Sequence, residues 1–326
     1  MVIGVCMQGR SEILVKMRKM FSFIVIGKNE GWKLSLCFES IVNSIKTNRI
    51  ECYEILYIDA QSSDNSLSIA QKYPDIKTFV ITGKCNAAIA RNIGGIESQG
   101  DILVFLDGDM ELQADFIPCL FERSGELIHP FISGINSHWF YNNRWELVSV
   151  KNLPKIQDNV FEKTTGGFFI ITKILWVTVG GMDSRLQANE DLDFGLSLSK
   201  AMFFPLRIAK VGVIHHTLES LDSSRIWKKM LLYRFSALLV RKHLFTNRHY
   251  AYLFLRMNYS VVLLLLTLAT FSPFVLTVYL LVVIIRSIKR KVSKVYRVFP
   301  YFISRDLLFL ISLFVFFPST PKIEYK

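Results

Sequence analysis

Short apolar runs alternate with longer amphipathic segments over the first third of the chain. The runs are rich in β-branched and aromatic residues and are bounded by Gly, Asn, Asp and Ser, a pattern typical of strands. We predict strands at residues 21–26, 54–59, 77–81 and 102–106, and helices at about 31–45, 66–73 and 86–99. Alternating strands and helices with short connections indicate an α/β fold with a mostly parallel sheet and right-handed crossovers.

Polar residues follow three of these strands at the carboxyl end. They are Asn29 and Glu30 after the first strand, Asp59 and Asp64 after the second, and Asp107 and Asp109 after the fourth. Because parallel strands point their carboxyl ends the same way, we expect these side chains to converge on one edge, where such sheets bind ligands. Asp64 has an alternative role, as a cap of the helix that follows it.

The segment Asp107-Gly108-Asp109 directly follows the most apolar of the predicted strands. Two carboxylates separated by one glycine offer oxygen ligands to a hard divalent cation, and Gly108 leaves room for a phosphate to approach the backbone. Asp-Gly is also a common turn after a strand, so the neighbouring segments must decide between a turn and a metal site.

Residues 112–165 carry a weaker pattern. We predict a helix near 115–122, a strand near 131–137 and a loop over 138–163. The loop contains Trp139, Tyr141 and Trp145, which are either a surface for stacking sugars or local packing.

Five motifs follow one another between Phe21 and Thr217. They are GKNEG at 27–31, the segment at 59–64, ARNIGG at 90–95 with GDILVFLDGDM at 100–110, TGGFFI at 165–170, and GGMDSRLQANEDLDFGLSL at 180–198. Each motif alone is a weak signal. Together and in this order they resemble a family 2 glycosyltransferase of the GT-A fold, a Rossmann-like sheet flanked by helices.

The resemblance implies a nucleotide-sugar donor, usually a UDP-sugar, and a role for each matching residue. Asp59 would face the base, Asn29 and Glu30 the base or ribose, Arg91 the base or a phosphate, and Asp107 the ribose. Asp109, with Asp107, would ligate Mn²⁺ or Mg²⁺ at the diphosphate, where the cation stabilises the departing charge. Asp191 would be the general base of an inverting transfer, taking the proton of the acceptor hydroxyl.

Two further segments refine this implication. In some relatives a histidine near His215-His216 is another metal ligand; we take His216 as the candidate, and leave open both His215 and a purely structural role. Processive polysaccharide synthases carry Gln-x-x-Arg-Trp downstream, and residues 222–227 (DSSRIW) depart from it. The departure favours transfer of one sugar to each acceptor.

The last third of the chain differs in charge and hydropathy. Residues 225–326 contain 17 Lys and Arg against two acidic residues, whereas residues 1–224 carry a net charge of −3. Residues 259–285 include no charge, which is enough to span a bilayer of about 30 Å. The basic cluster after them opposes a single span, so we expect a re-entrant hairpin that turns at Ser272-Pro273. A second apolar segment at 299–318 is interrupted by Arg305-Asp306, a possible ion pair.

We therefore expect an N-terminal extension (1–19), a GT-A catalytic domain (20–222) and C-terminal hydrophobic helices (223–326) that bind membrane lipids. The expected protein is a metal-dependent inverting glycosyltransferase with a cytoplasmic catalytic domain on the inner membrane, and a lipid-linked or glycan acceptor in cell-surface polysaccharide or glycoconjugate synthesis. The alternatives are a nucleotidyltransferase that makes nucleotide sugars and a non-catalytic membrane scaffold. The acidic first two thirds exclude nucleic acid as a partner, and the five scattered cysteines, without CxxC spacing, suit a reducing cytosol.

Overall fold

A computed structural model describes residues 19–162, 164, 166–218, 230–289 and 295–326. The chain forms two compact units. The sheet unit comprises residues 1–185, 190–220 and 320–326, and the helical unit comprises residues 186–189 and 221–319. The predicted N-terminal extension, except Lys19, and the predicted boundary at residue 222 lie outside the described residues.

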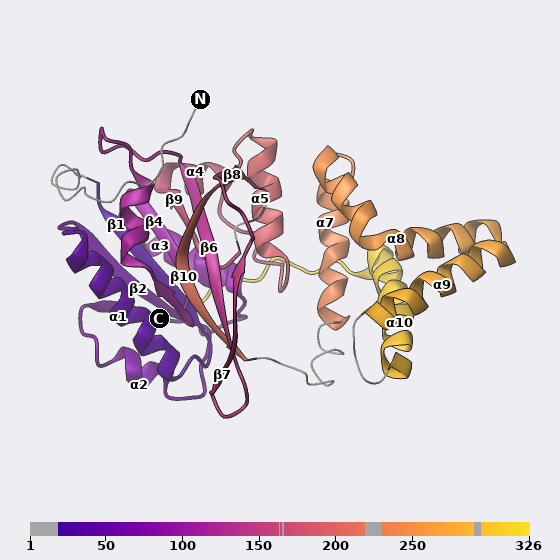
Figure 1. The fold of residues 1–326 in the computed structure, drawn as a ribbon, viewed down its shortest axis with the longest axis horizontal. Helices are drawn as coiled ribbons and strands as arrows, with labels where there is room; N and C mark the ends of the chain where they lie inside the picture. The colour runs from indigo at the N-terminus through magenta and orange to yellow at the C-terminus, as the bar shows by residue number, and fades with distance from the viewer. Residues whose placement is uncertain (1–18, 163, 165, 219–229, 290–294) are drawn as a thin grey trace. The chain divides into compact units, whose positions relative to one another are not determined.

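The strands of the sheet unit form one ten-stranded sheet (Figure 1). Its path is β3-β2-β1-β4-β9-β6-β10-β5, with β7 paired to β6 and β8 paired to β10. The strands are β1 (Phe21–Gly27), β2 (Tyr53–Asp59), β3 (Ile76–Val80), β4 (Ile102–Asp107), β5 (Met110–Leu112), β6 (Phe131–Tyr141), β7 (Leu147–Leu153), β8 (Val160–Phe161), β9 (Phe169–Thr172) and β10 (Leu206–Leu218). The first four strands are mutually parallel, as predicted, and β9 joins them to the parallel pair β6 and β10 by antiparallel pairing on both its sides.

The register of β1 aligns the carboxyl ends of its two neighbours. Gly27 pairs with Asp59 of β2, and Ile26 pairs with Asp107 of β4. The polar residues that follow these strands therefore begin at the same level of the sheet, which confirms the predicted convergence at one edge.

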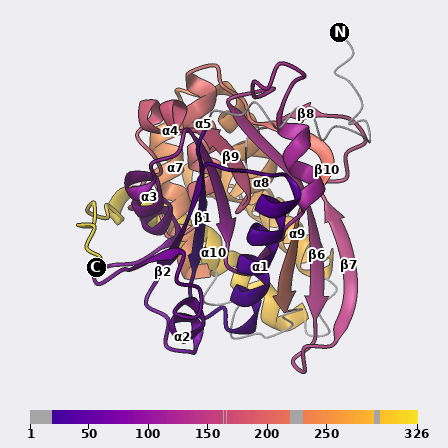
Figure 2. The ribbon, with the colours of Figure 1, turned by 90° about the vertical axis from the view of Figure 1, so that its left-hand side faces the viewer.

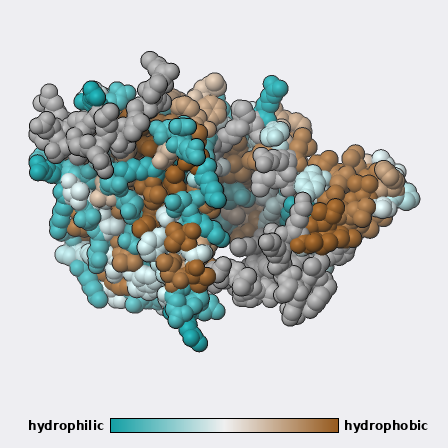
Figure 3. Space-filling view, viewed as in Figure 1, coloured by the Kyte–Doolittle hydropathy of each residue, from teal (hydrophilic) through white to brown (hydrophobic). Residues whose placement is uncertain are grey.

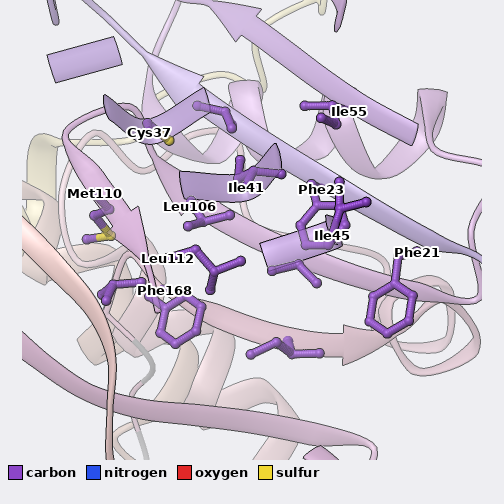
Figure 4. Packing of buried hydrophobic residues seen from close by; sticks show 14 of the residues in the cluster. Phe21, Phe23, Cys37, Ile41, Ile45, Ile55, Leu106, Met110, Leu112 and Phe168 are labelled. Carbon is purple, nitrogen blue, oxygen red and sulfur yellow. The ribbon is translucent and has the colours of Figure 1, made fainter. Parts of the chain in front are cut away.

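Helices cover both faces of the sheet (Figure 2). They are α1 (Trp32–Thr47), α2 (Ser66–Ala70), α3 (Ala87–Glu97), the 3₁₀ helix η2 (Ala114–Leu120), α4 (Lys173–Val179) and α5 (Glu190–Lys200). Alternate residues of the central strands face opposite sides: Phe23 packs with Ile41 of α1 in one core (Figure 4), and Ile24 packs with α3, α4 and α5 in the other. A Cβ at Gly94 of α3 would lie 2.2 Å from Ile24, so glycine permits this close packing.

The middle segment is more ordered than its sequence indicates. The helix expected near 115–122 is the 3₁₀ helix η2, and the strand expected at 131–137 continues to Tyr141. The prediction of a loop over 138–163 is wrong, because β7 pairs with β6 as an antiparallel hairpin and β8 pairs with β10. The β7 residues are mostly exposed, so the sequence carries little of the alternating pattern that marks a half-buried strand.

The last residues of the chain lie along the outer edge of β3. The Lys326 N–H donates to Val80 O at 3.0 Å, and the Val80 N–H donates to Lys326 O at 2.8 Å. Tyr325 packs edge-on against Phe79 and donates its hydroxyl to Glu97. Residues 324–326 thus pair with the outer edge of β3 and with the residues that follow it.

The helical unit contains α7 (Ser236–His243), α8 (Arg248–Thr270), α9 (Pro273–Lys289), α10 (Val295–Val315) and the 3₁₀ helix η3 (Tyr233–Phe235). α8 and α9 form a helical hairpin (Figure 1), and the turn predicted at Ser272-Pro273 is confirmed. Proline begins α9, where no intrahelical N–H bond is lost. The predicted ion pair also forms, because Arg305 Nε donates to the buried Asp306 Oδ1 at 2.9 Å.

A single helix over residues 259–285 does not form, because α8 ends at Thr270. Within the described residues, none of the helices combines the length and the apolar character needed to cross a membrane. The end of the α8–α9 hairpin nevertheless exposes large apolar side chains: Phe271 is 86% exposed and Phe274 is 75% exposed. Figure 3 shows hydrophobic residues covering this hairpin.

Candidate active site

The ends of β1 and β2 hold one half of the site. Asp59 is fully buried; its carboxylate accepts from Tyr57 Oη at 2.9 Å and from the Ser62 N–H at 2.8 Å. Asn29 adopts φ of 59° and accepts from the Ser63 N–H at 2.7 Å, so the β1 and β2 loops are joined. Burial and the adjacent Asp59 carboxylate raise the pKa of Tyr57, which keeps it a hydrogen-bond donor.

Asp64 has a local role at the start of α2. Its Oδ1 accepts from the Ser66 N–H at 2.9 Å and also from the Ser66 hydroxyl. The same Ser66 Oγ accepts from the N–H groups of Glu30 and Gly31 at 3.0 and 3.1 Å. These contacts favour the alternative role of Asp64, as a cap at the start of α2. Through Ser66, Asp64 also helps to hold the loop that bears Glu30.

Arg91 of α3 lies at the centre of a buried network. Its NH2 donates to Asp107 Oδ1 at 2.7 Å and its NH1 donates to Glu190 Oε1 at 3.2 Å. Burial raises the pKa of Asp107 and of Glu190, although the charge of Arg91 opposes the rise in both. The Arg91 Nε has no partner among the described residues. Arg91 therefore joins the end of β4 to the start of α5. Its expected place near the base or a phosphate stays a prediction.

Gly167 allows Asp107 to occupy this position. A Cβ at Gly167 would lie 2.0 Å from Asp107 Oδ2, far inside van der Waals contact. The TGGFFI motif therefore contributes by close backbone approach to the Asp-Gly-Asp segment, and it carries no chemistry of its own.

A second group of charges surrounds Asp109. His215 Nε2 lies 3.2 Å from Asp109 Oδ2, Lys33 Nζ lies 3.6 Å from the same oxygen, and Lys33 also donates to Glu30 Oε2 at 2.6 Å. Burial raises the pKa of Glu30, and the charge of Asp109 adds to the rise. Despite burial, the hydrogen bond and charge of His215, with the charge of Lys33, lower the pKa of Asp109.

The two histidines point to different surroundings. The His215 ring faces Asp109 and lies 3.0 Å, between the Nδ1 atoms, from His138 of β6. The His216 ring is buried, shares a hydrogen bond with Tyr141 Oη at 2.8 Å and pairs with Glu111. Because neighbouring side chains of a strand point to opposite faces, only His215 reaches the Asp109 side. The choice of His216 as the metal ligand is therefore not favoured by the geometry.

The donors around Asp109 suit a divalent cation. A carboxylate oxygen and an imidazole nitrogen are both good Mn²⁺ ligands, and Mg²⁺ at nucleotide sites takes one or two carboxylates plus phosphate oxygens. No three His, Cys, Asp or Glu residues in the part of the chain that the structure describes lie close enough to hold a metal by themselves. Asp109 and His215 together offer two donors to such a cation.

The expected general base lies at the start of α5. Asp191 is half-buried and its Oδ1 accepts from the Leu192 N–H at 2.8 Å. Of the adjacent acids, Glu190 binds Arg91 and Asp193 is buried. Asp191 is thus the acid of this trio that is neither paired with Arg91 nor fully buried.

Helix α3 also fixes the loop that leads to Asp191. Asn92 Nδ2 donates to Met182 O, and the Met182 N–H donates to Asn92 Oδ1, both at 2.8 Å. Asn86 Nδ2 donates to Ser184 O at 2.8 Å. Asn92 and Lys33 were not among the predicted site residues, although Asn92 lies within the motif at 90–95 and Lys33 lies two residues after the motif at 27–31.

An aromatic cluster borders the Asp109 group. Trp32 packs edge-on with Trp145 at 5.3 Å between ring centroids and with Tyr141 at 6.3 Å. Both tryptophans remain about two fifths exposed, at 42% and 40%. The cluster combines local packing with an exposed aromatic surface, so the two interpretations of Trp139, Tyr141 and Trp145 are not exclusive.

Part of the chain is similar in sequence to known glycosyltransferases. Residues 22–173 match the family described as Glycosyl transferase family 2. An uncharacterized glycosyltransferase of Haemophilus influenzae is 26% identical, in an alignment that covers 58% of this chain and 65% of that protein.

Two solved structures are also similar, each 16% identical. GalNAc-T7 with UDP, GalNAc and Mn²⁺ has a TM-score of 0.50 over 63% of this chain and 45% of that one. Residues 1–349 of S. aureus TarS in complex with UDP have a TM-score of 0.44 over 67% of this chain and 64% of that one. The chain thus spans less than two thirds of each of these proteins. The likeness to GalNAc-T7 confirms the predicted fold class, an α/β sheet flanked by helices that resembles GT-A glycosyltransferases.

Proposed function

We propose that this chain is a family 2 glycosyltransferase that moves a sugar from a nucleotide-sugar donor to a hydroxyl group. One observation carries the proposal: Arg91 joins Asp107, at the donor-side strand end, to the start of α5, which bears Asp191. Asp107, on the side of the nucleotide-sugar donor, and the helix that carries the candidate base Asp191 are thus joined in one network. The family match over residues 22–173 supports the same reaction.

The donor would lie across the ends of β1, β2 and β4. Buried Asp59 and the Asn29 loop are suited to the nucleoside, because their oxygens are already oriented by fixed hydrogen bonds. A uracil base, with an N–H that a carboxylate can accept from, is the natural partner of Asp59. GalNAc-T7 was solved with UDP, which supports a UDP-sugar as the first donor to test.

The diphosphate would lie near Asp109 and His215, the two residues that would hold Mn²⁺ or Mg²⁺ there. When bound, the cation would stabilise the negative charge that grows on the departing diphosphate. Asp109 and His215 would fix the position of the cation, and Lys33 contributes a further positive charge beside Asp109.

Asp191 would take the proton of the acceptor hydroxyl as its oxygen attacks the anomeric carbon. Attack from the face opposite the departing diphosphate inverts the configuration. A positioned carboxylate of this kind typically contributes about 10²- to 10⁴-fold to the rate.

We extend the proposal to the acceptor and the location. Trp32 and Trp145 offer exposed aromatic faces beside the site, which supports an acceptor with a sugar ring. The exposed phenylalanines at the end of the α8–α9 hairpin support attachment to a membrane surface, here the inner membrane with the sheet unit in the cytoplasm. A lipid-linked glycan would combine both features. The segment at 222–227, which bears on transfer of one sugar at a time, lies outside the described residues.

The test is turnover by purified, detergent-solubilised protein with Mn²⁺ or Mg²⁺, over UDP-, GDP- and dTDP-sugars, with membrane lipid extract as acceptor. We expect metal-dependent release of nucleoside diphosphate that falls at least 100-fold in Asp191→Asn and in Asp109→Asn. Asp75→Asn, at an exposed turn before β3, is the matched control and should retain wild-type turnover. A folded protein that binds none of the nucleotides would contradict the proposal.

A further inference from the structure

An ammonium group already occupies the surroundings of Asp109. Lys33 Nζ donates to Glu30 Oε2 at 2.6 Å and lies 3.6 Å from Asp109 Oδ2. The three side chains are only 12%, 16% and 19% exposed, so water screens these charges weakly. Lys33 thus neutralises part of the negative charge to which a divalent cation would bind.

The aromatic cluster borders the Lys33 ammonium on one side, and the flexible lysine stem allows the ammonium to move within the remaining space. Its Nζ lies 5.8 Å from the centroid of the Trp145 ring, which itself packs on Trp32. Lysine carries a compact charge on a flexible stem with three rotatable donors, unlike the rigid fork of arginine. The ammonium can therefore leave Asp109 while it keeps Glu30, without any change of the backbone.

A divalent cation and this ammonium compete for the same oxygen. His215 Nε2 and Lys33 Nζ both lie within 3.6 Å of Asp109 Oδ2. A cation bound to Asp109 and His215 would repel Lys33 at close range, unless further negative charge arrived with it. The diphosphate of a nucleotide brings that charge, and it has enough oxygens for the cation and the ammonium together.

We propose that Lys33 is a resident cation that a divalent metal ion must displace from Asp109, and that the donor diphosphate binds the displaced ammonium. The inference rests on the proposed function, because it assumes a nucleotide diphosphate at this edge of the sheet. Its consequence is cooperative binding: each of the metal ion and the nucleotide raises the affinity for the other by the same factor.

The first measurement is a titration of the metal-free full-length protein with Mn²⁺ in the absence of nucleotide. The electron paramagnetic resonance signal of Mn²⁺ that stays free in solution reports how much has bound. We expect Lys33→Met to bind Mn²⁺ about tenfold more tightly than wild type, because it removes the competing charge. Lys33→Arg should bind no more tightly than wild type, since its charge remains and its fork holds carboxylates better. Lys28→Met removes an exposed charge of the same loop and should match wild type.

The second measurement repeats the titration with UDP present. UDP should tighten Mn²⁺ binding in wild type, and by a clearly smaller factor in Lys33→Met. The proposal is overturned if folded Lys33→Met binds Mn²⁺ no more tightly than wild type, or if neither protein binds Mn²⁺ at millimolar concentration. If Lys33→Met gains affinity for Mn²⁺ but no nucleotide sugar turns over, displacement of Lys33 stands and the glycosyl transfer fails.

Discussion

Each aspartate of the Asp-Gly-Asp segment forms a pair with a glutamate, and a different basic side chain bridges each pair. Arg91 bridges Asp107 and Glu190, with a side chain that is 3% exposed and two separate hydrogen bonds. Lys33 bridges Glu30 and Asp109, with one close contact and one at 3.6 Å. We call the Arg91 bridge closed, because both of its contacts are hydrogen bonds. We call the Lys33 bridge open, because its contact with Asp109, at 3.6 Å, is longer than a hydrogen bond.

The difference follows from the two side chains. A guanidinium is planar and directs its donors along fixed lines, so Arg91 holds β4 and α5 at a set separation. The ammonium of Lys33 has no such fork and lies beside Asp109 and Glu30. We infer that the arginine bridge builds the site, whereas the lysine bridge is exchanged when ligands bind.

Loss of the arginine bridge should have the largest effect. Arg91→Met would leave the partly buried Asp107 and Glu190 without their cation; breaking a fully buried ion pair typically costs about 3–5 kcal/mol of folding free energy, which is the upper bound for this pair. We expect a large fall in the midpoint of chemical denaturation, and a loss of turnover even where the protein stays folded.

Arg91→Lys is the matched control for that loss. It keeps the charge but can replace only part of the two-sided contact, so its stability should fall between the other two proteins. Equal stability of Arg91→Met and wild type would show that the bridge does not hold the fold together.

The closed bridge also shows which parts of the site the sequence predicts. The strands, their parallel order and the convergence of Asn29, Asp59, Asp107 and Asp109 follow from apolar runs that end in polar residues. The ion pair of Arg91 with Glu190 joins residues 99 positions apart, and no local pattern indicates such a contact. The role of Arg91 in binding a donor stays a prediction, and its contacts with Asp107 and Glu190 depend on tertiary packing.

Other features left no clear signal in the sequence. β7 exposes most of its residues, so its pairing with β6 is set by the hairpin and not by burial. The pairing of residues 324–326 beside β3 depends on backbone hydrogen bonds, and every residue except proline can donate one. His215 and His216 are neighbours in sequence, and only the phase of β10 decides which one faces Asp109.

The two histidines allow the open half of the site to be tested at intermediate effect. His215→Gln should weaken Mn²⁺ binding about tenfold or more, because it removes a ligand beside Asp109. His216→Gln should leave Mn²⁺ binding nearly unchanged, but lower stability by about 1–3 kcal/mol, since Tyr141 and Glu111 lose a buried partner. Titration with Mn²⁺ and thermal unfolding of both variants separate the two roles. If His216→Gln lost Mn²⁺ binding and His215→Gln kept it, His216 and not His215 would be the metal ligand.

The smallest effect concerns Glu54, a carboxylate at the opposite end of the strands with no part in the proposed reaction. It is 7% exposed and accepts from Ser22 Oγ at 2.7 Å and Lys77 Nζ at 2.9 Å, as well as from the Gln99 N–H. Burial raises the pKa of Glu54, but these hydrogen bonds lower it on balance below its ordinary value of 4.5. A folded pKa below the unfolded one stabilises the protein above pH 4.5, and this stability is lost as the pH falls through the folded value.

Glu54→Gln should therefore cost about 1–2 kcal/mol at pH 7, and its deficit relative to wild type should shrink below pH 4.5. Denaturation of both proteins at pH 7, 5 and 3.5 measures this difference, and a deficit that stays constant over the series would contradict the assignment. The sheet thus stabilises a charged carboxylate at the end without a proposed reaction. At the site end, burial raises the pKa of Glu30 and Asp107, so their charged forms are less favourable in the free protein. His215 and Lys33 instead lower the pKa of Asp109 and favour its charged form.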